Sequence, residues 1–464
     1  MMVEKLVQYV GCPGPRRVLW WGVTAVAIAL IATGCRATPP VEDDPTPVEE
    51  PEPGEAPQPE EEFEEDDEAP QKDDDADERE DTAEDDGVER VASHVESRII
   101  SAIEDADQGD VDGAIEALVD LIDEPEGGFM AAYNAGVLHD RRGDLREAAQ
   151  YYAAALQRQP DFTPALQNLI RLYLRVGEVA EADEVGRTFV ERRPDNLDHR
   201  AAYLDVALAR GRYEDAIAGA REVLRRDVEH VDAMIQLARA KYHLGRYELA
   251  AAIVRGRAMA LSPERSELYF ILGQIAWAMD QPEDAQEYFA KAVDLQPRFP
   301  EARNNYAILL LNAGNFARAI DHLERALEDA PLYVEAWVNL GNAYKADGQY
   351  GEAEKAYQEA LAIDDESGEA HYNLGLLYLE AEVPGHELID RNQLAIQSLN
   401  RYRQLVGERQ ASEDMVGEYV NEAMSNIEAE EQRLEARRQL QAAQGGNDDD
   451  DDDEDDEDDE EDLD

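Results

Sequence analysis

The sequence has 464 residues, with 107 Asp and Glu against 43 Lys and Arg, which gives a formal net charge of −64. Nucleic-acid phosphates and anionic lipid headgroups are bound by clustered cations, so this charge argues against both and favours basic, neutral or apolar partners. The only cysteines, Cys12 and Cys35, lie near the N-terminus. A folded core therefore has no disulfide framework or cysteine metal site to hold it together.

Residues 1–34 have the pattern of an export signal. Two arginines precede a mostly apolar run that ends at Ile31, and small residues from Ala32 to Gly34 lead to Cys35. This order resembles a bacterial lipobox, which implies that Cys35 is lipidated and becomes the first residue of the mature protein. Two other interpretations stay open: ordinary secretory cleavage nearby, and an uncleaved anchor, although the run is shorter than the ~20 residues that span a bilayer.

Two acidic segments flank the rest of the chain. Residues 35–90 are rich in Pro, and between 41 and 90 they carry 26 acidic residues against 3 basic ones, with Phe63 almost alone as an apolar side chain. Such a segment cannot offset its ordering entropy by apolar burial, which predicts a disordered tether. The tail, residues 446–464, is predicted to be a disordered, solvated segment, with weak collection of Ca²⁺ or of a basic partner as the alternative.

Between these segments the sequence repeats itself. An alanine, which in six of nine cases follows a charged residue, recurs every 34 residues, with one step of 35 and a last step of 42. The nine positions are Ala114, Ala148, Ala182, Ala216, Ala250, Ala285, Ala319, Ala353 and Ala395. A period of 34 indicates pairs of helices that stack into a solenoid.

The clearest unit begins at Val334. It carries Trp337, Leu340, Gly341, Tyr344, Ala353, Tyr357 and Ala360. These residues match the Trp, Leu-Gly, Tyr, Ala, aromatic and Ala positions of the tetratricopeptide repeat, and the array resembles that family. The resemblance implies an all-α, right-handed solenoid of about nine helix pairs over residues 91–410. Because small residues stand where the helices cross, we expect Ala353→Leu to destabilise the fold and Glu354→Gln to be almost neutral.

The end of the array departs from the period. An eight-residue excess around Pro384-Gly385 predicts an insertion, and residues 411–445 predict a helix that caps the open end. The order of lipobox, acidic linker, repeat array and inserted last unit, followed by Leu399-Asn400-Arg401-Tyr402, resembles the tetratricopeptide-repeat lipoproteins of bacterial gliding-motility machinery. That resemblance implies an outer-membrane lipoprotein that faces the periplasm.

Candidate partner-binding residues follow from the repeat. In this family the first helices line a groove that holds a peptide segment or a partner's helix, and Asn residues there bind peptide backbone; local hydrogen bonding is the alternative. The positions that match are Asn134, Asn168, Asn305, Asn339, Asn342 and Asn373. Arg239, Tyr242, Phe270 and Trp277 are added as interface anchors in the middle of the array, with packing between repeats as the alternative.

An enzyme is not expected. The eight histidines are scattered, and neither a metal-binding His-Glu-x-x-His helix nor a phosphate-binding Gly-rich loop occurs in the sequence. We expect no cofactor and no metal. The predicted function is a lipid-anchored scaffold that binds other envelope proteins, in a gliding-motility, pilus or secretion assembly; the alternative is a surface-exposed adhesin or a Ca²⁺-responsive protein that works through its acidic segments.

Overall fold

The computed structural model describes residues 86–445, with side chains from His94 to Ala442. Helices joined by short turns make up these residues, and none of them forms a strand. The predicted signal segment, Cys35 and the tail from residue 446 lie outside the described residues, as does most of the tether. The first helix begins at Asp86, inside the stretch assigned to the tether, and an acidic residue at a helix N-terminus is favoured by the helix dipole.

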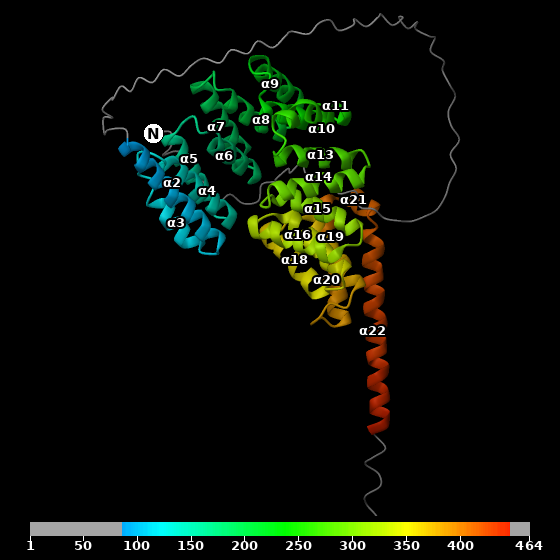
Figure 1. Ribbon diagram of the computed structural model, residues 1–464. Helices are drawn as coiled ribbons and strands as arrows, with labels where there is room; N and C mark the ends of the chain where they lie inside the picture. The colour runs from blue at the N-terminus through cyan, green and yellow to red at the C-terminus, as the bar shows by residue number, and fades with distance from the viewer. Residues whose placement is uncertain (1–85, 446–464) are drawn as a thin grey trace, which may run out of the picture. The chain divides into compact units, whose positions relative to one another are not determined.

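The helices of the described residues follow one another as nine antiparallel pairs (Figure 1). The first five pairs are α2 (Asp86–Asp107) with α3 (Val111–Val119), α4 (Gly128–Arg142) with α5 (Leu145–Arg158), α6 (Thr163–Arg175) with α7 (Val179–Arg192), α8 (Leu197–Ala209) with α9 (Tyr213–Arg226), and α10 (Val231–His243) with a helix in three parts, α11 (Tyr247–Ile253), the π-helical η1 (Val254–Ala258) and α12 (Met259–Leu261).

The other four pairs and the closing helices complete the array. They are α13 (Ser266–Ala278) with α14 (Pro282–Leu295), α15 (Pro300–Asn312) with α16 (Phe316–Asp329), α17 (Val334–Ala346) with α18 (Tyr350–Ile363), and α19 (Gly368–Glu380) with α20 (Leu388–Val406), followed by α21 (Glu408–Glu413) and α22 (Val416–Gly445). The prediction of an all-α solenoid with about nine helix pairs and a C-terminal helix is confirmed.

The repeating alanines mark the closest approach of the helices. All nine have no exposed surface. Where the best repeats carry Gly in the first helix, an aromatic ring of the second helix fills the space: a Cβ built on Gly341 would lie 2.4 Å from Cε1 of Tyr357. The side chain of Tyr357 is itself fully buried. Small residues are therefore required because the rings of the second helices occupy the crossings.

The two irregular steps of the repeat have separate structural causes. The second helix of the fifth pair runs from Tyr247 to Leu261, one residue longer than its 14-residue counterparts, and the π-helical η1 takes up that residue. A single-residue insertion into an α-helix is commonly accommodated as a π-bulge. In the ninth pair, seven residues, 381–387, replace a turn of three, 347–349, and α20 has seven residues before Ala395 where α18 has three before Ala353. The excess is therefore shared between a loop and an added helical turn.

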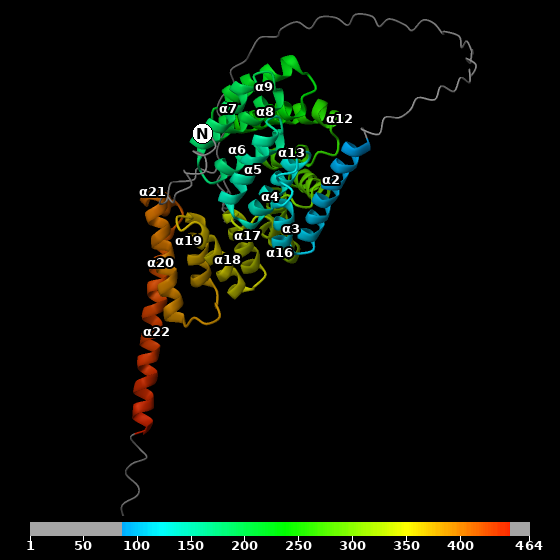
Figure 2. The same ribbon diagram turned by 90° about the vertical axis from the view of Figure 1, so that its left-hand side faces the viewer.

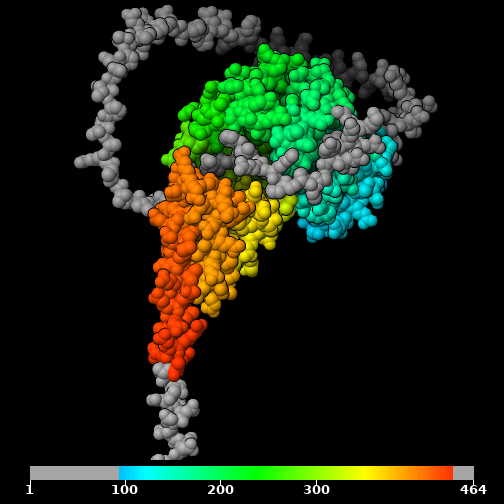
Figure 3. All heavy atoms as spheres, turned by 180° about the vertical axis from the view of Figure 1, so that it is seen from behind, coloured from blue at the N-terminus to red at the C-terminus, as the bar shows by residue number. Residues whose placement is uncertain are grey.

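The predicted capping helix is divided in two. Met415, with φ of 59°, separates α21 from α22. The first half of α22 packs on α20, with Val416 and Ala423 fully buried. Figures 1 and 2 show its second half continuing beyond the other described helices, and the space-filling view in Figure 3 shows the same stretch standing clear.

The stack curves enough for distant pairs to touch. Arg298, in the turn between α14 and α15, pairs with Asp107 at the end of α2 at 2.5 Å, across 191 positions of sequence. Leu332, in the turn after α16, packs against the turn between α4 and α5, where a Cβ on Gly143 would lie 3.2 Å from Cδ1 of Leu332. The first two pairs therefore contact the sixth and seventh.

Candidate inner-wall binding surface

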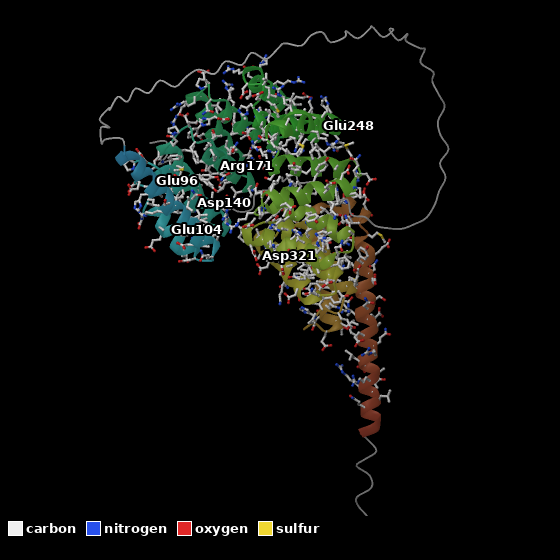
Figure 4. The ribbon with its side chains drawn as sticks, viewed as in Figure 1. Glu96, Glu104, Asp140, Arg171, Glu248 and Asp321 are labelled. Atoms are coloured by element: carbon white, nitrogen blue, oxygen red, sulfur yellow. The ribbon has the colours of Figure 1, made fainter. Side chains whose placement is uncertain are left out.

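The first helices of the pairs form the inner wall of this curve. Successive first helices contact each other along the stack, for example α6 with α8 and α8 with α10. Arg171 of α6 also reaches Glu267 of α13, three pairs further on. Figure 4 shows Arg171 between the two halves of the stack, whereas Glu248 of the second helix α11 lies at the outer edge. We call the surface formed by the first helices the inner wall.

A buried carboxylate organises the middle of the inner wall. Asp205 of α8 is only 4% exposed. Its Oδ1 accepts hydrogen bonds from Nε2 of Gln236, at 3.1 Å, and from the guanidinium of Arg239, both on α10. Its Oδ2 accepts no hydrogen bond and lies 3.7 Å from Nε of Arg171. A buried charge is tolerated only when it is paired, and here two arginines from the flanking units do so.

Glu267 joins the same network from the opposite side. Its Oε1 lies 3.1 Å from Nη2 of Arg171, and its Oε2 lies 2.7 Å from Nη2 of Arg265. Arg265 also pairs with Asp232 of α10. Burial acts to raise the pKa of Glu267, but the charges of Arg171 and Arg265 outweigh it and bring the pKa to about 2. This carboxylate therefore stays ionised throughout the physiological range.

Further along the wall, carboxylates at the same position of the repeat lack such partners. Glu301, Glu335 and Glu369 each occupy the second position of a first helix, as Glu267 does. Within the described residues none of the three forms an ion pair. Desolvation by the surrounding wall raises the pKa of the half-buried Glu335, helped by Asp364, and that of Glu369, whose side chain is exposed at the surface of the wall, helped by Glu335. We call Glu301, Glu335 and Glu369 the carboxylate row.

The predicted asparagines lie along the first helices, half-buried, and most of them bond within the chain. Nδ2 of Asn134 donates to its own helix at Met130, and Nδ2 of Asn168 donates to the hydroxyl of Tyr133 at 3.2 Å. Asn304 links two of the others: its Nδ2 donates to Asn305 at 3.4 Å, and its side-chain oxygen accepts from Nδ2 of Asn339 at 2.9 Å. Asn342 accepts a hydrogen bond from the hydroxyl of Tyr357 at 2.7 Å. Asn373 is half-buried too. These bonds agree with the alternative that the asparagines serve hydrogen bonding within the chain. Contact of the asparagines with a partner protein stays a prediction.

The predicted aromatic anchors pack between helices. The ring of Tyr242 lies 5.6 Å from that of Tyr247, and the ring of Phe270 lies 4.9 Å from that of Phe299. Trp277 packs on the core formed by the sixth, seventh and eighth pairs. All three are half-buried, so each contributes to packing and keeps part of its surface exposed.

Of the predicted residues only Arg239 belongs to the ionic network. The prediction missed Asp205, Glu267 and the carboxylate row. A signal for the acids was present, because six successive first helices carry an acid at their second position: Asp198, Asp232, Glu267, Glu301, Glu335 and Glu369. The pairing of Glu267 with Arg171 depends on the curvature of the stack, which spacing in one unit does not give.

One cluster on the wall has the composition of a metal site. Oxygen atoms of Asp198 and Asp232 and a ring nitrogen of His230 lie within 4.8 Å of one another. Nδ1 of His230 accepts the backbone N–H of Ala233 at 3.3 Å, which caps α10. A neutral ring that accepts at Nδ1 carries its proton on Nε2, facing Asp198 at 3.2 Å, and Asp232 is held by Arg265. The geometry is that of a helix cap beside the ion pair of Asp232 with Arg265.

The lipid-anchor prediction at Cys35 lies outside the described residues. Among the described helices, none combines the length and the apolar character needed to cross a bilayer.

Stacked helix pairs with a continuous inner wall define an α-solenoid of the kind that presents an extended surface to other proteins. The chain belongs to the tetratricopeptide-repeat family. One family model described as "Tetratricopeptide repeat" matches residues 101–161, 270–334, 307–367 and 338–408, and a second with the same description matches residues 141–204 and 207–259.

Several known proteins share this repeat. The chain is 26% identical over 246 residues to the BBSome complex member BBS4 of Bos taurus, covering 50% of this chain and 47% of that protein. It is 24% identical over 266 residues to the protein O-mannosyl-transferase TMTC3 of Homo sapiens, covering 53% and 29%. The chain thus spans about half the length of these relatives, or less. The crystal structure of the APC/C hetero-tetramer Cut9-Hcn1 is similar with a TM-score of 0.52 and 18% identity, over 68% of this chain and 59% of that one, which supports the fold.

Proposed function

We propose that this protein is a lipid-anchored scaffold that binds partner proteins of a bacterial cell envelope on its inner wall. The observation that carries the proposal is the carboxylate row, three acids on successive first helices that form no ion pair within the described residues. The chain carries no catalytic step in this proposal. Its role is to hold other proteins together in a gliding-motility, pilus or secretion assembly.

The carboxylate row favours a basic segment of the partner. At Glu267, the same position of the repeat binds the guanidinium groups of Arg171 and Arg265. A lysine or arginine from a bound segment would meet Glu301, Glu335 and Glu369 in the same way and relieve the raised pKa of the last two. Exposed pairs contribute about 0.2–1 kcal/mol each, so the row would change the affinity by up to about 100-fold.

The anchor part of the proposal rests on Cys35 and the residues before it. Lipidation there would fix the protein to a membrane, and the acidic segment that follows would hold the array at a distance from its surface. The test is Cys35→Ser in a bacterial host that is fed an alkyne fatty acid. The native chain should take up the label and fractionate with membranes, and the variant should do neither; equal labelling of both would reject this anchor.

The test of the inner wall is a capture experiment with the full chain from solubilised envelopes, followed by mass spectrometry. We compare the native protein with E301Q/E335Q/E369Q and with E283Q/E328Q/E359Q, a matched control on the exposed faces of second helices. Envelope proteins should be lost with the first variant and retained with the control. Retention with both would show that the carboxylate row does not bind them.

A deletion of the tail tests the alternative. If removing residues 446–464 abolishes capture while the carboxylate-row variant retains it, the acidic segment is the working part and the inner-wall proposal is wrong.

A further inference from the structure

The outer side of the fourth and fifth pairs has an apolar hollow that the inner-wall proposal does not use. It lies between α9 and the π-helical η1 and has a volume of about 380 Å³. Its lining residues are Leu224, Val228, Met234, Leu237, Ala252, Ile253, Gly256 and Arg257. The hollow coincides with the extra residue of the fifth pair, and π-bulges are often found at functional sites.

The hollow leaves unusually large apolar side chains in contact with water. Val228, in the turn between α9 and α10, lines the hollow and is 58% exposed. Leu224, Leu237 and Ile253 line it as well and are half-buried. Ordinary outer faces of solenoid helices are polar, so a grouped apolar surface of this kind indicates a contact site.

Arginines surround the apolar floor. A second hollow, lined by Ala218, Arg221, Leu224 and Arg225, shares Leu224 with the first. Arg257 lines the first hollow and pairs with Glu229 at 3.3 Å, and Arg225 pairs with Glu222. Within the described residues Arg221 forms no ion pair. The rim therefore carries three arginines, and Arg221 is the one whose charge no ion pair of the described residues offsets, in a chain whose formal net charge is −64. We call the two hollows together the outer groove.

We propose that the outer groove binds an acidic segment of a partner protein, with one bulky apolar side chain of that segment seated on Leu224, Val228 and Ile253. The apolar floor provides the burial, and Arg221, Arg225 and Arg257 meet the flanking carboxylates. A membrane surface fits less well, because the net charge of the chain opposes approach to anionic headgroups. The arginines of the outer groove lie on second helices and the carboxylate row on first helices, so the two sites select segments of opposite charge.

The experiment uses a fluorescent peptide with the sequence of residues 57–69 as the probe, because that stretch has one aromatic residue, Phe63, between carboxylates. Fluorescence anisotropy with the full chain should show binding that weakens as salt rises. A matched peptide with Ala in place of Phe should bind at least about tenfold more weakly, as expected for the loss of a buried ring.

Two exposed pairs of arginines give matched variants of the protein. R221E/R225E, in the outer groove, should weaken probe binding by about tenfold or more. R325E/R409E makes the same change of charge elsewhere and should bind like the native chain; these two side chains are 54% and 94% exposed. V228N should weaken binding without a change of charge. Equal binding by native and R221E/R225E proteins, or by the two peptides, would overturn the proposal.

Two further variants answer two separate questions. The first asks whether the probe binds to the outer groove or to the inner wall, and the second asks whether the natural occupant is a partner protein or the chain's own acidic segment. E335Q/E369Q, on the inner wall, should leave probe binding unchanged, so a failure of the outer groove is distinguishable from a failure of the proposed function. If the full chain with Phe63→Ala binds the probe more tightly than the native chain, then the chain's own segment occupies the groove. That result would overturn the proposal that a partner protein occupies the outer groove.

Discussion

Nη2 of Arg171 and Oε1 of Glu267 lie 3.1 Å apart although 96 positions of sequence separate the two residues. Arg171 stands on the third pair and Glu267 on the sixth, so the bond crosses the inner wall. Burial opposes the charge on Arg171, but Asp205 and Glu267 outweigh it and raise the pKa of the guanidinium. The charge of Glu301 also acts on Arg171, so the middle of the wall is neutralised from within, whereas Glu335 and Glu369 form no ion pair within the described residues.

This bond predicts a specific dependence of stability on pH. The pKa of Glu267 is about 2, below its ordinary value of about 4.3, so its ion pairs stabilise the fold fully above pH ~4.3 and are lost progressively as the pH falls toward 2. In urea titrations at pH 6, 4 and 3, the native protein and Glu267→Gln should converge as the pH falls. Glu301→Gln, at the same position of the next unit, is the control, and its stability should not converge with that of the native protein as the pH falls.

The helix crossings predict a large effect from one added side chain. Ala353 has no exposed surface, so Ala353→Leu should lower the free energy of unfolding by about 1–3 kcal/mol. The neutral control expected from sequence, Glu354→Gln, is unsuitable: the carboxylate is half-buried and accepts hydrogen bonds from Tyr378 and from Nε2 of His386, at 2.8 Å. Glu359→Gln on the exposed face of α18 replaces it. Equal urea midpoints for Ala353→Leu and Glu359→Gln would contradict the register.

A turn in the sixth pair predicts a stabilising substitution. Asp280 has φ of 57°, at the position where the turns of other pairs carry a left-handed Gly such as Gly348, with φ of 80°. A left-handed conformation is unfavourable for residues with a Cβ, so Asp280→Gly should raise stability by about 0.5–1 kcal/mol. The reciprocal change, Gly348→Asp, should lower it. Thermal melts that move in the same direction for both variants would refute this interpretation.

His322 predicts a second pH effect, in a higher range. Burial, followed by the positive charge of Arg303, lowers the pKa of His322 to about 4, and Arg303 donates a hydrogen bond to Nδ1 at 3.2 Å. A histidine held neutral in the fold stabilises it fully above pH ~6.5, and this contribution is lost as the pH falls toward 4. Denaturant titrations at pH 7, 5.5 and 4.5 should show a steeper loss for the native protein than for His322→Gln. Parallel curves would mean that the imidazole is not held neutral.

Most of the fold could be predicted because the repeat constrains neighbouring residues. A 34-residue spacing with Ala at each crossing identifies nine pairs, and every one of those alanines is fully buried. The step of 35 showed an extra residue, but spacing alone does not say whether it extends a turn or a helix. The structure places it in η1, where it also shapes the outer groove.

The candidate sites were predicted less completely, because they depend on contacts between units. Asn168 and Asn342 were chosen by position, and both bond tyrosine hydroxyls of the chain. Asp205 and Glu267 gave no signal as a pair, since Arg171, which lies beside both, comes from another pair of helices. The outer groove depends on exposed apolar residues such as Val228, which sequence does not distinguish from buried ones.

The contact between Asp107 and Arg298 has a consequence for cooperativity. In a linear repeat array each unit contacts only the units beside it, so the terminal units unfold first and independently of the rest. Here the first pair also holds the turn before the seventh, so the loss of α2 and α3 would remove a restraint from helices far away in sequence. The N-terminal end of this array is therefore thermodynamically linked to its interior, and fraying there costs more than the loss of one unit.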